Sequence, residues 1–124
     1  MLAWPVQAAV NTNTQIETPK VYLEAPSRYI AVPPKFIRSN CACIIFAREY
    51  TGRVDVKGWA GVLKPTIQTP YVGGIVITKE GNGHVAVITK IKDSSLHIIE
   101  SNYLPCQIGT RIIDINNPLI IGYR

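Results

Sequence analysis

The chain has 124 residues, which is enough for a single domain with one modest hydrophobic core. Its 47% hydrophobic and 17% charged residues are typical of a globular protein and exclude a disordered one. No apolar run approaches the ~20 residues of a membrane-spanning helix. Residues 1–6 lack the basic flank and the apolar stretch of a secretory signal, so none is expected.

The net charge of +5 favours a polyanionic partner such as nucleic acid, acidic lipid or an anionic cell wall. The lysines and arginines are scattered, however, and no dense basic run alternates with aromatic residues. Nucleic-acid-binding modules combine those two features. A small basic β-barrel that binds nucleic acid is therefore disfavoured, and no nucleic acid is expected as a partner.

The three cysteines, Cys41, Cys43 and Cys106, cannot all pair within one chain. This odd count argues against a disulfide framework and leaves at least one thiol free. Cys41-x-Cys43 has the form of half a zinc site, but no second pair of cysteines or histidines accompanies it. We therefore expect no metal site and no other cofactor.

Residues 1–38 differ in texture from the rest of the chain. They hold five of the nine prolines and the polar tract 11–14, and they show no sustained periodicity. Because proline fixes the backbone and removes a hydrogen-bond donor, we expect an extended arm or linker over residues 1–38. Such an arm either packs on the body or attaches the chain to a virion or a larger protein. The compact domain is expected over residues 39–124.

A helix is predicted over residues 42–50, because good helix formers follow a suitable N-cap at residue 39 or 40 and precede Gly52. Residues 44–47 are all apolar, so this helix is expected to be buried. A second helical segment is predicted between residues 56 and 63.

The pattern becomes strand-like after Pro70. Segments rich in isoleucine and valine alternate with turn residues and predict strands over residues 74–78, 84–91, 96–101, 111–115 and 119–123. Their spacing of about ten residues is typical of a meander of short antiparallel strands. The sequence thus predicts an α+β domain in which one helix packs on a twisted antiparallel sheet of about five strands.

Cys43 falls in the first turn of the predicted helix. The partial positive charge at a helix N-terminus lowers the pKa of a thiol and makes it nucleophilic, and the exposed N–H groups there can hold an oxyanion. Cys41 precedes the helix and lacks this effect. The alternative is that Cys43 is a small buried apolar residue, which is the common role of a free cysteine.

His84 starts a predicted strand directly after the glycine-rich turn 81–83, where a general base has room for a substrate. A solvent-exposed turn histidine fits the same pattern. Glu100 and Asn102 lie two residues apart on one face of the next strand, and either could orient the imidazole. A polar strand end fits them equally well. His97, in a strand centre, is expected to be structural or to face solvent.

The chain thus contains a cysteine, then a histidine, then an acid or amide. These are the residue types of a thiol nucleophile, its base and the group that orients the base. Residues 39–123 also resemble the CHAP domain, the cysteine, histidine-dependent amidohydrolase/peptidase group within the NlpC/P60 papain-like set. The similarity rests on four motifs in the family's order, namely CIIFAR at 43–48, GHVAV at 83–87, IESN at 99–102 and IIGY at 120–123.

The resemblance implies a papain-like fold and a thiol mechanism in which Cys43 is the nucleophile and His84 the general base and acid. By the same resemblance Glu100 orients His84, and Asn102 assists. The implied substrate is peptidoglycan, cut either at the muramoyl–alanine amide by an amidase or within its peptides by an endopeptidase. Phage endolysins, virion-associated lysins and bacterial wall-remodelling enzymes carry such domains. A phage lysin that reaches the wall from the virion, or from the host cytoplasm at lysis, is therefore expected.

The chain departs from the family pattern in two respects. The family often has Pro-x-x-Gly-Asp before the histidine strand, whereas this chain has PYVGG at 70–74. The structural contact that the family's aspartate would make is therefore not expected here, but the nucleophile is unaffected. Some members bind calcium through aspartates before the cysteine, but no aspartate precedes Cys43, so no such site is expected.

Two other functions remain open. One is a catalytically inactive CHAP-like protein that binds the wall or builds a virion, which would bind its ligand without cleaving a bond. The other is an acyltransferase that uses the same side chains, which a competing amine acceptor would reveal.

Overall fold

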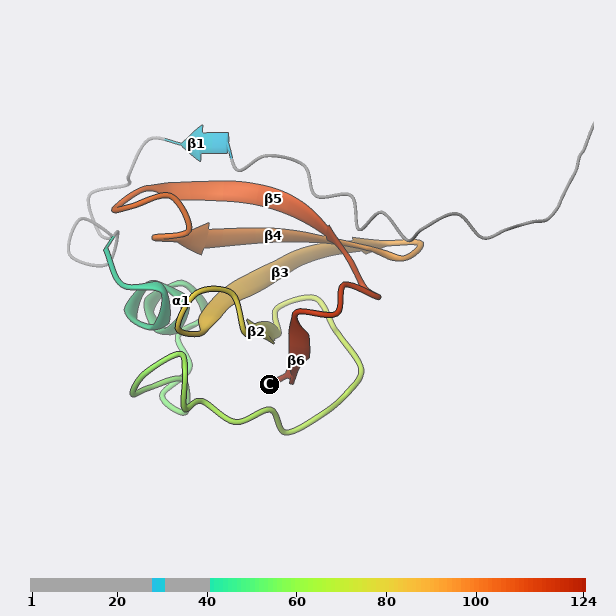
Figure 1. The fold of residues 1–124 in the computed structure, drawn as a ribbon, viewed down its shortest axis with the longest axis horizontal. Helices are drawn as coiled ribbons and strands as arrows, with labels where there is room; N and C mark the ends of the chain where they lie inside the picture. The colour runs from blue at the N-terminus through green and yellow to red at the C-terminus, as the bar shows by residue number, and fades with distance from the viewer. Residues whose placement is uncertain (1–27, 31–40) are drawn as a thin grey trace, which may run out of the picture.

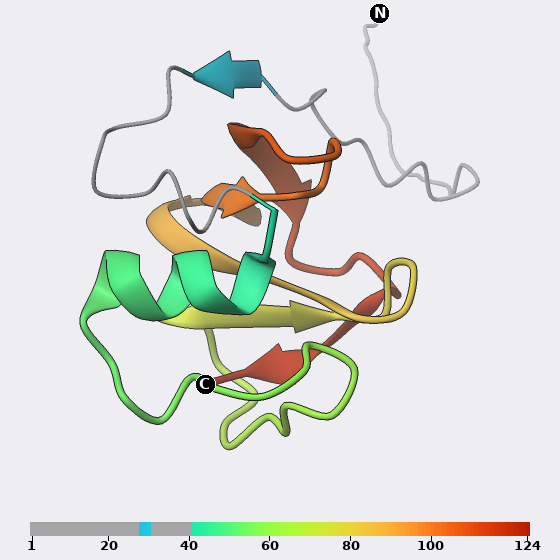
Figure 2. The same cartoon turned by 90° about the vertical axis from the view of Figure 1, so that its left-hand side faces the viewer.

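The computed structural model describes residues 28–30 and 41–124 (Figures 1 and 2). In that part of the chain, one helix packs against a six-stranded antiparallel sheet. The elements are, in chain order, β1 (Arg28–Ile30), α1 (Cys43–Thr51), β2 (Ile75–Thr78), β3 (His84–Lys92), β4 (Ser95–Ser101), β5 (Ile108–Asp114) and β6 (Ile120–Tyr123). The predicted α+β class is confirmed.

The helix α1 begins at Cys43 and ends before Gly52, whose left-handed φ of 72° stops it as predicted. Its N-cap is Ala42, so the predicted cap at residue 39 or 40 is wrong. Ala42 is extended, with φ −147° and ψ 103°, and makes no side-chain capping hydrogen bond. The first-turn N–H groups of α1 are therefore not covered by a capping side chain. In the described part of the chain, no helix has the length and hydropathy needed to cross a membrane.

The strand order is β1-β5-β4-β3-β2-β6, and all neighbours are antiparallel. Strands β2 to β5 form the predicted meander. The predicted meander does not extend to β6. Instead of pairing with β5, β6 pairs with β2 at the opposite edge of the sheet, and β1 pairs with the outer edge of β5 (Figure 1). This pairing of β6 adds Tyr123 to the apolar cluster under the sheet, which a simple meander would not do.

The hydrophobic core contains two large apolar clusters, one on each side of the sheet, and a small third cluster of Phe46 and Ile108. Because successive side chains of a strand point to opposite faces, β3 contributes to both large clusters, as the alternation in its sequence predicts. One cluster joins α1 to β2 and β3 (Figure 2) and contains Ile44, Ala47, Val56, Ile75, Ile77, Val85 and Val87. The other joins β2 to β6 and contains Val76, Ala86, Ile88, Leu96, Ile98, Ile113 and Tyr123.

The prediction of a second helical segment between residues 56 and 63 is wrong. This stretch forms turns, and its helical content is a single turn in which the N–H groups of Val62 and Leu63 both donate to the carbonyl of Trp59 at 3.0 Å. Gly58 has a positive φ of 86°, which ends any helix that includes it. The result is a loop that leaves the Trp59 side chain 80% exposed.

Strand β1 belongs to the segment that the sequence predicts as an arm. Its residues pair with β5 in the register Arg28↔Thr110, Tyr29↔Gly109 and Ile30↔Ile108. The rest of the predicted arm lies outside the described residues. The division at residue 38 and the role of the arm remain predictions.

The departure at residues 70–74 has a local explanation. A Cβ at Gly74 would lie 2.7 Å from the Tyr71 ring, so this chain has no room there for the family's aspartate. The Tyr71 hydroxyl accepts a hydrogen bond from Arg53, which pairs with Asp55 at 2.8 Å. Arg53 therefore links Asp55 and Tyr71 in one hydrogen-bonded group.

The turn before β3 packs backbone to backbone against the Trp59 loop. A Cβ on Gly83 would lie 2.5 Å from the backbone of Gly61, and one on Gly61 would lie 2.5 Å from the carbonyl oxygen of Asn82. Gly83 also has a φ of 106°, which side-chain-bearing residues rarely adopt. These two glycines set how closely the two loops approach.

Gly83→Ala should therefore destabilise the fold more than Gly81→Ala. Both positions have positive φ, but a Cβ on Gly81 meets nothing within 4 Å. We expect Gly81→Ala to cost roughly 1 kcal/mol of unfolding free energy and Gly83→Ala roughly 3 kcal/mol, because the second adds a backbone clash to the strain. Urea unfolding of both variants measures the difference. Equal costs would contradict the close packing of the two loops.

Candidate active site

Three of the predicted site residues converge at one end of the sheet. Cys43 is the first residue of α1, His84 the first of β3, and Glu100 lies near the end of β4. The packing of α1 on β3 and the pairing of β3 with β4 bring these distant positions together. The predicted order of thiol, histidine and acid thus corresponds to a continuous line of contacts.

Cys43 is partly buried, and burial acts to raise the pKa of its thiol. The hydrogen bond and charge of His84, with the backbone N–H groups of Val85 and Ile44, outweigh burial and lower the pKa of Cys43 below its ordinary value. The thiolate is the nucleophilic form of cysteine. Its position at the helix N-terminus is as predicted.

His84 is buried, 6% exposed, with its Nε2 2.8 Å from Oε1 of Glu100. Because Nε2 is engaged there, Nδ1 is the ring nitrogen left for the hydrogen bond with the thiol of Cys43. Burial acts to lower the pKa of His84, but the hydrogen bonds and charges of Cys43 and Glu100 raise it to about 9. The two shifts, downward for the pKa of Cys43 and upward for the pKa of His84, both favour a thiolate–imidazolium pair over the neutral pair.

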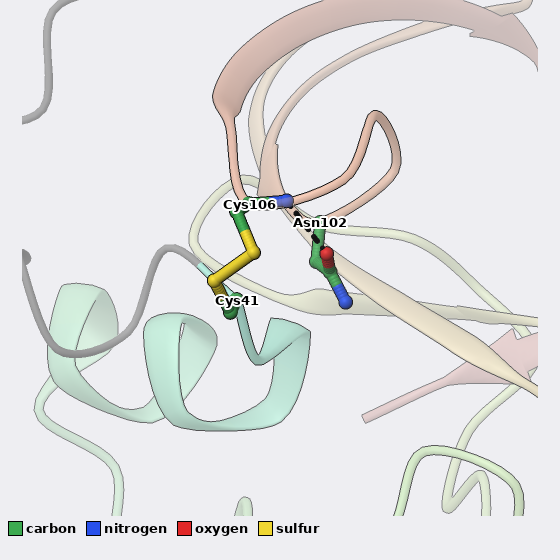
Figure 3. Close-up of a disulfide and its surroundings, with 3 residues drawn as sticks. All are labelled: Cys41, Asn102 and Cys106. Atoms are coloured by element: carbon green, nitrogen blue, oxygen red, sulfur yellow. Dashed lines mark hydrogen bonds between the residues drawn. A yellow bond between two sulfur atoms is a disulfide. The ribbon is translucent and has the colours of Figure 1, made fainter.

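Asn102 lies beside this line of contacts and is not bonded to the ring. It follows the end of β4 with a positive φ of 61°, so it does not continue the alternation that would place it on the face of Glu100. Its side-chain oxygen accepts a hydrogen bond from the backbone N–H of Cys106 at 2.8 Å (Figure 3). Of the two orienting groups that the sequence leaves open, Glu100 is the one that contacts His84.

Arg111, a buried residue that contacts Glu100, was not predicted as a site residue from the sequence. Its Nε donates to Oε2 of Glu100 at 2.7 Å, and its guanidinium also binds both carboxylate oxygens of Glu80. The pKa of Glu80 is lowered, because Arg111 outweighs the burial that raises it. One signal could have identified it. Arg111 is a charged residue in an isoleucine-rich segment, and charged residues that are buried are almost always paired with an opposite charge.

A disulfide joins Cys41 to Cys106 and ties the start of α1 to the loop after β4 (Figure 3). The odd count did not predict this single bond, but the prediction of at least one free thiol is confirmed by Cys43. The count of cysteines did not show that Cys106 would lie next to Cys41, because that proximity depends on the path of the loop. The bond fixes the residue two positions before the reactive thiol.

Two adjoining pockets flank the pair of Cys43 and His84. The larger, of about 420 Å³, lies on the cysteine side and is lined by Cys41, Ala42, Cys43, Ile44, Ile45, Gly58, Trp59, Ala60, Gly61, Asn82, Gly83 and Asn102. The smaller, of about 240 Å³, lies on the histidine side and is lined by Glu80, Gly81, Asn82, Gly83, His84, Asn102 and Tyr103. They share three residues, so an extended substrate could occupy both.

The other predicted features lie away from this site. His97 is partly buried in the centre of β4, opposite Ile112, as expected of a structural residue. Within the described residues, no three histidine, cysteine, aspartate or glutamate side chains come together in a way that could hold a metal ion.

Replacing both disulfide cysteines with serine should lower the unfolding free energy by about 4 kcal/mol, because the bond closes a loop of 65 residues in the unfolded chain. Urea unfolding of the double variant Cys41→Ser, Cys106→Ser against the oxidised wild type measures this change. A thiol titration of the denatured wild type should detect Cys43 alone. Three titrating thiols would contradict the disulfide.

The reactivity of Cys43 should report its lowered pKa. The rate of Cys43 alkylation by iodoacetamide should rise with pH, with a midpoint below about 8.5, the pKa of an ordinary thiol. The reason is that the imidazolium of His84 stabilises the thiolate. In His84→Gln that stabilisation is lost while burial remains, so the midpoint should move above the wild-type value. An unchanged midpoint in His84→Gln would contradict the pairing of the two side chains.

Comparison with known proteins agrees with this geometry. The family model of the CHAP domain matches residues 33–102, which is more than half of the chain and includes Cys43, His84, Glu100 and Asn102. A search of curated proteins finds no match. The chain therefore belongs to the CHAP domain family of cysteine, histidine-dependent amidohydrolases and peptidases.

Proposed function

We propose that this chain is a peptidoglycan hydrolase that cuts an amide or peptide bond of the bacterial cell wall. The observation that carries the proposal is the hydrogen-bonded line from Cys43 through His84 to Glu100. It contains a nucleophile, a group that carries a proton and a group that holds the proton carrier. The family supplies the class of substrate.

In the first half of the reaction, the Cys43 thiolate attacks the scissile carbonyl carbon. Negative charge then develops on the carbonyl oxygen, and the N–H groups of the first turn of α1, which no side chain caps, would stabilise it. The imidazolium of His84 donates its proton to the leaving nitrogen as the C–N bond breaks. An amine departs, and a thioester on Cys43 remains.

In the second half, water attacks the thioester carbonyl and His84, now neutral, accepts a proton from it. The C–S bond breaks, the carboxylic acid product leaves and the thiolate–imidazolium pair is restored. Glu100 keeps the ring in place through both halves by its hydrogen bond to Nε2. Activity should therefore rise as Cys43 ionises and fall above about pH 9, where His84 loses the proton that the leaving amine requires.

Asn102 is proposed to contact the substrate, because it lines both pockets and its oxygen is held by the Cys106 backbone. It would then assist binding without orienting the histidine. This differs from the role that the resemblance implies for Asn102.

The net charge and the disulfide both support an anionic cell wall as the place where this protein acts. The net charge of +5 would draw the protein to such a surface. A disulfide is typical of proteins that work outside a reducing cytoplasm. We extend the proposal to a phage endolysin or virion-associated lysin, attached to a virion or a larger protein through residues 1–38, on the support of family context.

The test is digestion of purified peptidoglycan by the wild type, Cys43→Ala and His84→Ala, with the released fragments weighed by mass spectrometry. We expect the wild type to release fragments and each variant to lose roughly 10³-fold or more of the rate. His97→Ala is the matched control, since it removes a histidine outside the site. Fragment masses distinguish an amidase from an endopeptidase.

Other outcomes would replace the proposal. Binding to several wall types without release by the wild type would favour the inactive wall-binding or virion protein. Equal release by the wild type and Cys43→Ala would show that Cys43 is not the nucleophile. Transfer to an added amine in place of hydrolysis would indicate an acyltransferase.

A further inference from the structure

Arg111 lies at the centre of a buried cluster of charges behind His84. Its side chain is 1% exposed, and that of Glu100 is completely buried. Arg111 donates from Nε to Oε2 of Glu100 at 2.7 Å and from Nη2 to Oε1 at 3.0 Å. The second of these oxygens is the one that lies 2.8 Å from Nε2 of His84. Both carboxylate oxygens of Glu100 are therefore held by one guanidinium.

The sheet explains how Arg111 reaches Glu100. In the pairing of β4 with β5, Arg111 stands opposite Ile98 and Gly109 stands opposite Glu100. Residues two apart on a strand share a face, so Arg111 and Glu100 are diagonal neighbours on the same face. Gly109 has no side chain, which leaves space for the guanidinium to lie against the carboxylate.

Arg111 is itself fixed on its other side. Its Nη1 and Nη2 donate to the two oxygens of Glu80 at 2.9 and 3.0 Å, and Thr78 donates to Glu80 at 2.9 Å. The ring of Tyr103 lies under the guanidinium, 3.6 Å from its central carbon. The guanidinium is therefore clamped between two carboxylates and one aromatic ring.

We propose that Arg111 is a positioning residue for the thiol reaction, acting through Glu100. A carboxylate bound only to His84 could rotate and present either oxygen. The two-pronged contact with Arg111 removes that freedom and directs Oε1 at His84. This in turn keeps the ring oriented so that Nδ1 faces Cys43. The inference rests on the proposed function only in taking Cys43 as the nucleophile.

The charges around His84 are consistent with this role. The titratable and charged side chains that face the ring and its partners are Cys43 from α1, Glu80 from the turn before β3, Glu100 from β4, Tyr103 from the loop after it and Arg111 from β5. Without Arg111, two carboxylates would share a buried site with no cation between them. Glu100 would then lose the donors that fix its two oxygens and hold Oε1 toward His84.

The test compares Arg111→Lys and Arg111→Met with the wild type. Arg111→Lys keeps the charge but loses the two-pronged geometry, and Arg111→Met loses both. We expect kcat to fall roughly 10- to 100-fold with little change in KM, because the reacting groups are misplaced and the pockets are intact. The midpoint of Cys43 alkylation should rise in both variants, further in Arg111→Met.

The matched control is Arg53→Met. Arg53 also binds both oxygens of a carboxylate, that of Asp55 at 3.0 and 2.8 Å, but it lies beyond the opposite end of α1. Its replacement should lower stability without moving the alkylation midpoint. A merely structural Arg111 would behave in the same way.

Wild-type kcat and wild-type alkylation midpoints in folded Arg111→Lys and Arg111→Met would overturn the proposal. If both variants fail to fold, Tyr103→Leu decides, because it removes the ring under the guanidinium at an exposed residue and changes no charge. A raised midpoint in Tyr103→Leu supports the proposal, and an unchanged one overturns it. The alkylation measurement needs no peptidoglycan. Failure to cleave the wall, which contradicts the proposed function, is therefore distinguishable from failure of this inference.

Discussion

The hydrogen bond between His84 and Glu100 is the constraint on which the rest of the site depends. The two residues are 6% and 1% exposed, so neither can exchange its partner for water without a large cost. A charged His84 requires the carboxylate, the carboxylate requires Arg111, and Arg111 binds Glu80 in turn. The register of β3, β4 and β5 must therefore hold for the histidine to stay charged and oriented.

The rest of the fold brings Cys43 to that histidine. The apolar face of α1 packs on β2 and β3 and sets the height of the helix over the sheet. The disulfide from Cys41 to Cys106 fixes the start of the helix, and the close approach of Gly61 and Gly83 fixes the loops around the pocket. Three kinds of restraint, namely apolar packing, a covalent bond and backbone contact, thus converge on one thiol.

Local features of the sequence could be predicted, and features that depend on long-range pairing could not. Gly52 stops α1, and the alternation around His84 gives β3 and its two faces, because each effect arises within a few residues. The order of cysteine, histidine and acid predicted three residues that the structure brings into contact. Arg111 and Cys106 were missed because their partners are set by strand register and by the path of a loop. The helix expected near Trp59 fails for a local reason, the positive φ of Gly58.

We infer that His84 is held as an imidazolium between Cys43 and Glu100. The most direct measurement is an NMR titration of the His84 ring nitrogens in the wild type and in Cys43→Ser. The account predicts a wild-type pKa near 9, with both nitrogens protonated at pH 7, and a lower pKa in Cys43→Ser, where the thiolate is lost. A wild-type ring that is neutral at pH 7, or one unaffected by Cys43→Ser, would contradict it.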